Sequence, residues 1–90
     1  MKIEIEKKRS RVLLDKLGVY DWPVWQKEVS EFDWFYADRE TCYVLEGRVT
    51  VTPEGGNSIE IEEGDLVTFP KGMACVWKIS RPIKKHYTFG

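Results

Sequence analysis

The stretch FDWFYADRETCYVLEG, Phe32 to Gly47, sets the strand pattern of this chain. Four aromatic rings fall within its first five residues, and a short charged loop separates them from Glu40. An apolar run follows Glu40 and ends at Gly47, a residue type that is typical of tight turns. Alternation with a period of two places Phe32, Trp34 and Tyr36 on one face of a strand. We therefore expect an aromatic strand, followed by a second strand that starts at the carboxylate of Glu40.

The chain has 90 residues, of which 42% are hydrophobic and 32% are charged. This length predicts a single domain over residues 1–90, and the composition is that of a folded globular protein. A formal net charge of −1 gives no basic surface for nucleic acid, and short basic runs such as Lys84-Lys85 are interpreted as solvated surface. No apolar run is long enough for a membrane span or a signal peptide, so we expect no membrane partner. These features predict a cytoplasmic protein, or an organellar one if a transit peptide has been removed.

From Glu31 onward the sequence consists of short strand patterns separated by turn signals. Strands are predicted at residues 31–36, 41–46, 48–52, 58–62, 66–69, 74–79 and 83–89. Lys2 to Glu6 also alternates with a period of two, and is interpreted as an edge strand or a subunit-pairing strand. Ser10 and Gly18 are suited to cap one short helix between them. Trp22-Pro23 predicts an extended bend, after which Trp25 packs back onto the core.

Two spacings within these strands resemble the two conserved motifs of the cupin superfamily. Six residues separate Glu40 from Gly47, as in the second half of the first motif. Gly64, five residues, Pro70-Lys71-Gly72 and then Cys75 resemble the second motif. The run ETCYVLEGRVTVTPEG, followed by GDLVTFPKGMACVW, looks like the small single-domain cupins grouped with ureidoglycine aminohydrolase and the ethanolamine-utilisation cupin. The resemblance implies an all-β cupin barrel of the jelly-roll type with one short N-terminal helix, in agreement with the many short strands.

The resemblance also indicates which residues occupy the metal-ligand positions of metal-dependent cupins. There, a His-x-His pair, the glutamate and a later histidine bind one divalent metal inside the barrel. In this chain the pair is replaced by Trp34 and Tyr36, and the last histidine by Cys75. Only Glu40 keeps its residue type, so no cofactor and no metal are expected. If the gap between the ligand pair and Glu40 were longer by one residue, the pair would be Asp33 and Phe35 instead of Trp34 and Tyr36. Trp34 and Tyr36 share a strand face with Phe32, which favours the alignment with the shorter gap.

An atypical metal site is a second possibility. The chain contains one histidine, His86, so a site of three histidines cannot form. Glu40, Cys75 and His86, with Cys42 as a further donor, would be the ligands of such a site. The alternative is that both cysteines are reduced, buried core residues and that His86 lies on a strand surface.

We expect a pocket for a small-molecule ligand inside the barrel. Its predicted lining is Trp34, Tyr36, Glu40, Cys42, Cys75 and Trp77. A glutamate among rings requires a raised pKa or a partner such as Tyr36, His86 or a basic side chain. Glu40 is therefore a candidate general acid or base, and a structural glutamate bonded to backbone is the equal alternative. Cys75 and His86 are further catalytic candidates, as nucleophile and base.

Three kinds of function are compatible with this sequence. The first is a metal-independent or atypically liganded enzyme acting on a small polar metabolite, with aminohydrolase activity implied by resemblance alone. The second is a non-catalytic module that binds or senses a small molecule, and the third is a structural domain whose pocket has become core. The strand around Ile3 and Ile5, together with the many aromatic residues, also predicts a homodimer.

Overall fold

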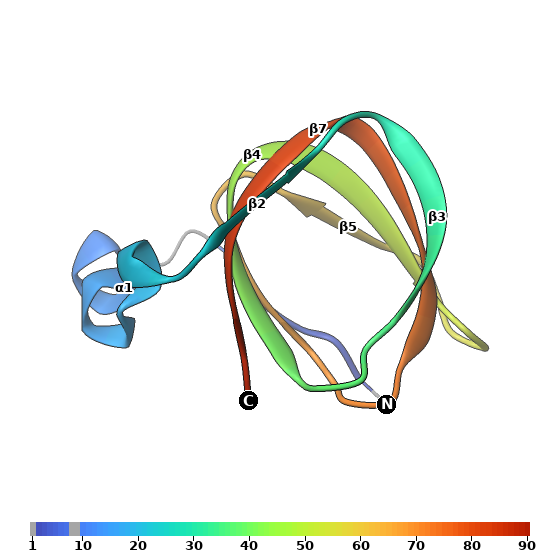
Figure 1. The fold of residues 1–90 in the computed structure, drawn as a ribbon, viewed down its shortest axis with the longest axis horizontal. Coiled ribbons are helices and arrows are strands. Elements are labelled where there is room, and N and C mark those ends of the chain that lie inside the picture. Colours follow the sequence, from blue (N-terminus) through green and yellow to red (C-terminus); the bar gives the residue numbers. More distant parts are fainter. Residues whose placement is uncertain (1, 8–9) are drawn as a thin grey trace.

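The structure of the protein is a computed structural model that describes residues 2–7 and 10–90. It begins with β1 (Glu4–Lys7), α1 (Arg11–Leu17) and the 3-10 helix η1 (Val19–Asp21). The strands that follow are β2 (Val24–Lys27), β3 (Ser30–Phe35), β4 (Glu40–Pro53), β5 (Ile59–Glu62), β6 (Asp65–Phe69) and β7 (Ala74–Phe89). The strands curve around a common interior, and α1 lies outside them to one side (Figure 1). This arrangement confirms the predicted all-β barrel with one short helix.

Two long strands, β4 and β7, run through both halves of the barrel. They pair antiparallel along nearly their whole length, from Glu40 opposite Phe89 to Pro53 opposite Cys75. The order in the sheet is β1-β6-β4-β7-β2, while β5 pairs with β4 and β3 pairs with β7. One half of each long strand pairs with β6 or β2, and the other half pairs with β5 or β3. Each long strand therefore belongs to both halves of the barrel and bends between them (Figure 1).

The bend lies where the register between β4 and β7 shifts, between Val44 and Val49. Gly47 has a φ of +103°, and a Cβ atom at this position would lie 2.3 Å from the carbonyl oxygen of Pro82. Glycine is required here by both the backbone angle and the close approach of the strands. Pro82 is outside the paired residues of β7, so its missing N–H removes no ladder bond. The sequence predicted that strands end at Gly47 and at residues 81–82. Instead β4 and β7 continue through these positions, because the chain bends there without reversing.

The N-terminal helix has the caps that the sequence predicts. The Ser10 side chain accepts a hydrogen bond from the backbone N–H of Leu13 at 3.3 Å, and Gly18 ends the helix in the left-handed conformation. Leu14 packs with Val19 and Leu66 in a small cluster separate from the barrel core. The helix therefore covers the outer face of β6 and leaves the barrel interior to the strands.

The segment after Pro23 forms a strand that the sequence analysis did not predict. Residues Val24–Lys27 pair with His86 to Ile83 of β7. Trp25 does pack inward, with its ring centroid 6.1 Å from that of Trp77. The segment is too short and too polar to give a strong strand pattern, and its pairing with β7 fixes its conformation. Among the described residues, no helix is long and apolar enough to span a membrane.

Candidate functional site

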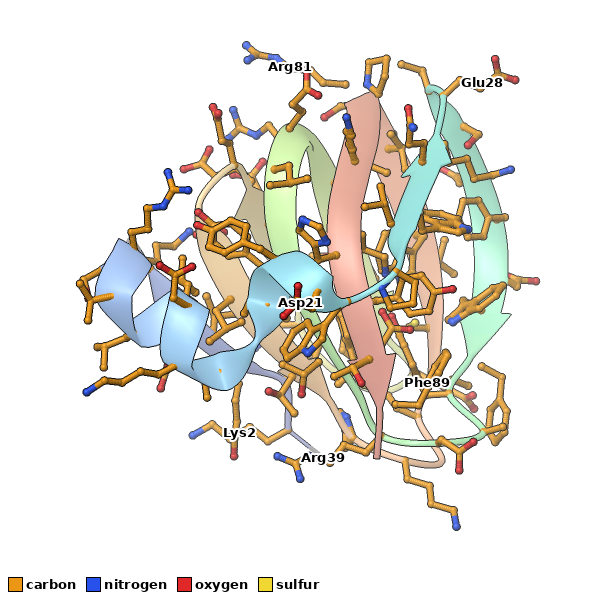
Figure 2. The ribbon with its side chains drawn as sticks, turned by 60° about the vertical axis from the view of Figure 1, so that its left-hand side comes forward. Lys2, Asp21, Glu28, Arg39, Arg81 and Phe89 are labelled. Carbon is orange, nitrogen blue, oxygen red and sulfur yellow. The ribbon has the colours of Figure 1, made fainter. Side chains whose placement is uncertain are left out.

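The barrel interior contains a cavity of about 210 Å³ with aromatic walls. The lining comes from β2, β3, β4 and β7: Trp25, Phe32, Trp34, Glu40, Trp77, Lys85, Tyr87 and Phe89. Trp34 is 44% exposed and Phe89 is 56% exposed, so these two rings lie at the opening. Figure 2 shows Phe89 and Arg39 at the end of the barrel opposite Arg81 and Glu28. The cavity is smaller than the roughly 300–1,000 Å³ of sites for drug-sized ligands, so it has room only for a smaller molecule.

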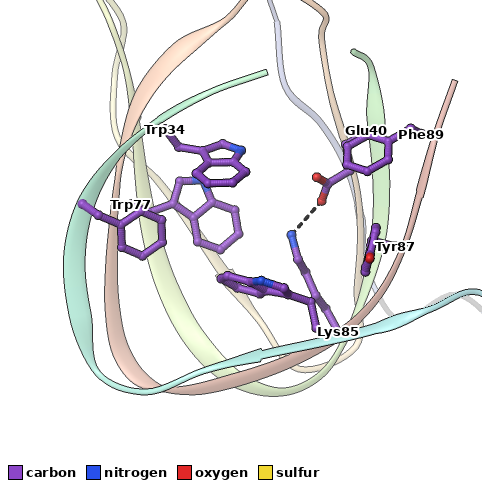
Figure 3. Close-up of a pocket in the computed structure, with 8 residues that line it drawn as sticks. Trp34, Glu40, Trp77, Lys85, Tyr87 and Phe89 are labelled. Atoms are coloured by element: carbon purple, nitrogen blue, oxygen red, sulfur yellow. Dashed lines mark hydrogen bonds and ion pairs between the residues drawn. The ribbon is translucent and has the colours of Figure 1, made fainter. Parts of the chain in front are cut away.

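A buried ion pair is the polar part of this cavity. The Nζ atom of Lys85 donates a hydrogen bond to Oε2 of Glu40 at 2.6 Å, and the two side chains are only 6% and 5% exposed. The ammonium also lies 4.7 Å from the ring centroid of Trp77 and 5.1 Å from that of Trp25. The rings contribute cation–π attraction, which is stronger in a desolvated setting. Figure 3 shows the pair between Trp34 and Trp77 on one side and Tyr87 and Phe89 on the other.

The burial of Lys85 corrects the interpretation of Lys84-Lys85 as solvated surface. Strand β7 continues through Pro82, so its alternation extends from the first half to the second. Cys75, Trp77 and Ile79 are buried, and so are Ile83 and Lys85 on the same face. Continuous alternation therefore turns the side chain of Lys85 into the barrel.

His86 lies on the opposite face of β7 from Lys85. Its Nδ1 atom is 2.9 Å from the backbone oxygen of Trp22, and its ring meets that of Tyr20 edge to face at 5.9 Å. These partners belong to the helical segment outside the barrel. The structure therefore separates His86 from Glu40 and Cys75, with which the sequence grouped it as possible metal ligands and catalytic residues.

Tyr36 lies behind the wall of the cavity and supports it. The indole N–H of Trp77 donates a hydrogen bond to the Tyr36 hydroxyl at 3.1 Å, and the Tyr36 ring stacks on Phe69 at 4.7 Å. Burial raises the pKa of the Tyr36 phenol far above its usual value, and the nearby Glu40 carboxylate raises it further. Tyr36 is therefore a neutral hydroxyl that fixes the orientation of Trp77.

Both cysteines are buried free thiols. Burial raises the pKa of Cys42 to about 12, with Lys85 opposing the increase and Glu40 adding to it. Burial likewise raises the pKa of Cys75 to about 11. The Sγ atom of Cys75 lies 3.7 Å from the backbone oxygen of Trp34. At neutral pH both thiols stay protonated, which is the unreactive form.

The predicted site residues divide into three groups. Trp34, Glu40 and Trp77 line the cavity together. Tyr36, Cys42 and Cys75 lie in the adjoining core, and His86 lies outside it. The alternative alignment fails on position, because Asp33 and Phe35 are exposed and are not among the residues that line the cavity with Glu40.

One of the two charged residues of this site, Lys85, and four of its six rings, Trp25, Phe32, Tyr87 and Phe89, were absent from the predicted lining. Lys85 and Trp25 approach each other across β7 and β2, and Tyr87 and Phe89 follow Lys85 on the same face. The signal for Lys85, Tyr87 and Phe89 was the period of two in β7, counted without a break at Pro82. For Trp25 the bend at Pro23 predicted packing onto the core, but its place in the lining depends on the pairing of β2 with β7.

The residues present do not fit a divalent metal of the kind that metal-dependent cupins bind. Within the parts of the chain that the structure describes, no three His, Cys, Asp or Glu side chains lie together as a metal site would need. The positions that correspond to ligands carry two rings, Trp34 and Tyr36, and the protonated thiol of Cys75. Glu40 instead contacts an ammonium. The positive charge beside this carboxylate is therefore supplied by Lys85.

The fold and the motif spacings agree with a comparison against protein-family models. Residues 14–87 match the model described as the EutQ-like cupin domain. The chain belongs to the EutQ-like cupin family. This membership confirms the resemblance to small cupins that the spacings of Glu40 and Gly64 indicated. No curated protein matches the chain.

Solved structures place this cupin among proteins of known fold. A DUF861-family protein from Thermotoga maritima is 54% identical, with a TM-score of 0.95 over 99% of this chain and 100% of that one. A putative ethanolamine utilization protein Q from Salmonella typhimurium is 26% identical, with a TM-score of 0.66 over 73% of this chain and 53% of that one.

A more distant neighbour shares the fold alone. Acireductone dioxygenase from Bacillus anthracis, solved with a cadmium ion in its active centre, is 17% identical with a TM-score of 0.52. The match covers 97% of this chain and 47% of that one. The cupin described here spans about half the length of this neighbour and of the Salmonella protein.

Proposed function

We propose that this cupin binds a small organic metabolite in its aromatic cavity, with Glu40 and Lys85 as the polar groups that orient it. The observation that carries the proposal is a buried ion pair facing an open cavity. Small-molecule sites usually combine apolar walls with a few convergent polar groups, and this cavity has that composition.

A purely structural role for the pair accounts for the cavity less well. A core that needs only stability favours dense packing, and replacing a buried ion pair by apolar residues is often neutral or stabilising. Here the charged pair lies beside a cavity of about 210 Å³. Two partly exposed rings, Trp34 and Phe89, give access from solvent. The buried charges, the cavity beside them and its access to solvent together favour binding.

Catalysis by the same pair is the second candidate. Glu40 is a possible base and the Lys85 ammonium a possible acid, and their contact at 2.6 Å places both beside one bound molecule. This arrangement requires no metal. Turnover of the bound metabolite would distinguish an enzyme from a binding or sensing module.

Native mass spectrometry of freshly purified protein tests the proposal. We expect a bound small molecule, or its release on denaturation, for the wild type and a lower occupancy for Glu40→Gln. The exposed Glu60→Gln variant is a matched control and should keep the wild-type occupancy. Wild-type protein without any bound molecule, and with no binding in a metabolite screen, would contradict the proposal. The same spectra report the mass of the assembly and so test the homodimer that we also propose.

A further inference from the structure

We infer that the ligand of this cavity is a small, neutral, planar molecule with a hydrogen-bond donor and an acceptor side by side on one edge, as in a cyclic amide. This inference rests on the proposed function, because it assigns a ligand class to the same cavity. It follows from the charge balance of the lining, from one carboxylate oxygen without a partner, and from the arrangement of the rings.

The charge balance selects a neutral ligand. Glu40 and Lys85 are the charged members of the lining, and they neutralise each other at 2.6 Å. A ligand with a net charge would bring an unbalanced charge into a desolvated site, which is costly. A neutral ligand leaves the pair intact and hydrogen-bonds to it.

Glu40 supplies an acceptor for a donor on the ligand. Its Oε2 atom receives the hydrogen bond from Lys85, whereas Oε1 accepts none from any described residue. The Glu40 side chain is only 5% exposed. A buried carboxylate oxygen without a donor is unfavourable, so an N–H or O–H group of the ligand gains an interaction that the protein alone does not provide.

Lys85 supplies a donor for an acceptor on the ligand. Its ammonium has three N–H groups, and the hydrogen bond to Glu40 uses one of them. The rings of Trp25 and Trp77 attract the ammonium by cation–π interaction but accept no conventional hydrogen bonds from it. Because this ammonium and the Glu40 carboxylate are in contact, the donor and the acceptor of the ligand must also be neighbours. The N–H and C=O of a cyclic amide have this relation.

The walls favour a flat ring of limited size. Phe32 and Trp77 are stacked at 6.1 Å with an interplanar angle of 22°, and Trp25 meets Trp77 edge to face. Such walls offer faces and edges to a planar ligand. A cavity of about 210 Å³ corresponds to the liquid volume of about seven water molecules, which is enough for one ring with small substituents.

A titration with four matched probes tests the ligand class. The probes are 2-pyridone, N-methyl-2-pyridone, benzoate and benzylamine, and the readout is the indole N–H signals of the four tryptophans in NMR spectra. We expect 2-pyridone to shift the signals of Trp25, Trp34 and Trp77. Trp22 packs in the separate cluster near the helix and is the internal control. N-methylation removes the donor, so N-methyl-2-pyridone should bind at least about tenfold more weakly.

Charge variants provide the second half of the test. Glu40→Gln leaves Lys85 unbalanced and should shift the preference to benzoate, whereas Lys85→Met leaves Glu40 unbalanced and should shift it to benzylamine. The double variant restores neutrality and should again bind both ions weakly. If a single variant fails to fold, the wild-type probe series decides the matter by itself.

The outcomes separate this inference from the proposed function. Tighter binding of either ion than of 2-pyridone to the wild type, or equal binding of the two pyridones, overturns the ligand class while the binding pocket stands. A charged molecule identified by native mass spectrometry has the same meaning. If no probe shifts Trp25, Trp34 or Trp77 and no co-purified molecule is found, both the ligand class and the proposed function fail.

Discussion

Lys85 reaches Glu40 diagonally between two paired strands, β7 and β4, with 2.6 Å between Nζ and Oε2. On the backbone, Lys85 pairs with Val44, whereas Glu40 pairs with Phe89. The ammonium therefore contacts a residue four positions along β4 from its own backbone partner, and Cys42 lies midway between these two residues of β4. This position explains why the charge of Lys85 acts on the pKa of the Cys42 thiol.

Removing one member of this pair should be strongly destabilising. Lys85→Met leaves the carboxylate of Glu40 buried without a counter-charge, and we expect a loss of about 3–5 kcal/mol in the free energy of unfolding, measured by urea denaturation. Adding Glu40→Gln should recover part of this loss, because the unpaired charge is removed. Glu60→Gln, in the exposed pair with Arg48, should leave the unfolding midpoint almost unchanged. Equal effects of Lys85→Met and Glu60→Gln would mean that the interior pair is solvated.

The hydrogen bond between Trp77 and Tyr36 gives a second prediction. Tyr36→Phe leaves the buried indole N–H of Trp77 without an acceptor, so we expect a loss of about 1–3 kcal/mol. Tyr87→Phe is the matched control, since its hydroxyl hydrogen-bonds to no described residue. Thermal and urea unfolding measure both variants. A larger loss for Tyr87→Phe than for Tyr36→Phe would contradict this assignment.

The bend between the barrel walls should be intolerant of any side chain at Gly47. In Gly47→Ala, the new Cβ atom would lie 2.3 Å from the Pro82 oxygen and 2.7 Å from the Cα atom of Ile83. Gly64→Ala is the matched control, because Gly64 also has a positive φ but its Cβ would meet open space. We expect Gly47→Ala to lose about 1–3 kcal/mol more than Gly64→Ala, the usual cost of overpacking. Similar unfolding midpoints for the two variants would show that the strands can separate.

Because burial raises the pKa values of both cysteine thiols, we expect the protein to lose stability in alkaline solution. The folded pKa values of about 12 for Cys42 and about 11 for Cys75 lie above the ordinary thiol value of 9.0. A raised pKa means that the folded state holds these protons more tightly. The contribution of these two thiols to the free energy of unfolding is complete below pH 9. It is lost as the pH rises through their folded pKa values. Urea unfolding between pH 8 and pH 11 should show this decline, and it should be smaller in the Cys42→Ala, Cys75→Ala double variant.

Alkylation gives an independent check on the same thiols. At pH 8 we expect iodoacetamide to modify native protein far more slowly than urea-unfolded protein, because the thiolate form is rare in the fold. Rapid modification of Cys75 in the native protein would contradict its raised pKa.

The sequence predicted the helix and most strands because their signals are local. Ser10 and Gly18 determine the helix ends by the shape and conformational freedom of single residues. Alternation around Trp34 identified a wall of the barrel in the same way. Pro82 misled the prediction, because a proline usually ends a strand, whereas here it lies in an unpaired position of β7. Once β7 was divided, the alternation that turns Lys85 inward was lost.

The sequence by itself determined the barrel class, the aromatic face of β3 and the place of Glu40 as a buried carboxylate. It also showed that histidine ligands are too few for the usual cupin metal site. The partner of Glu40 was decided only by the tertiary structure, because Lys85 lies 45 residues away along the chain and meets it through the pairing of β4 with β7. A local pattern can place a side chain on a face, but only the closed barrel brings opposite charges from two strands into the same desolvated space.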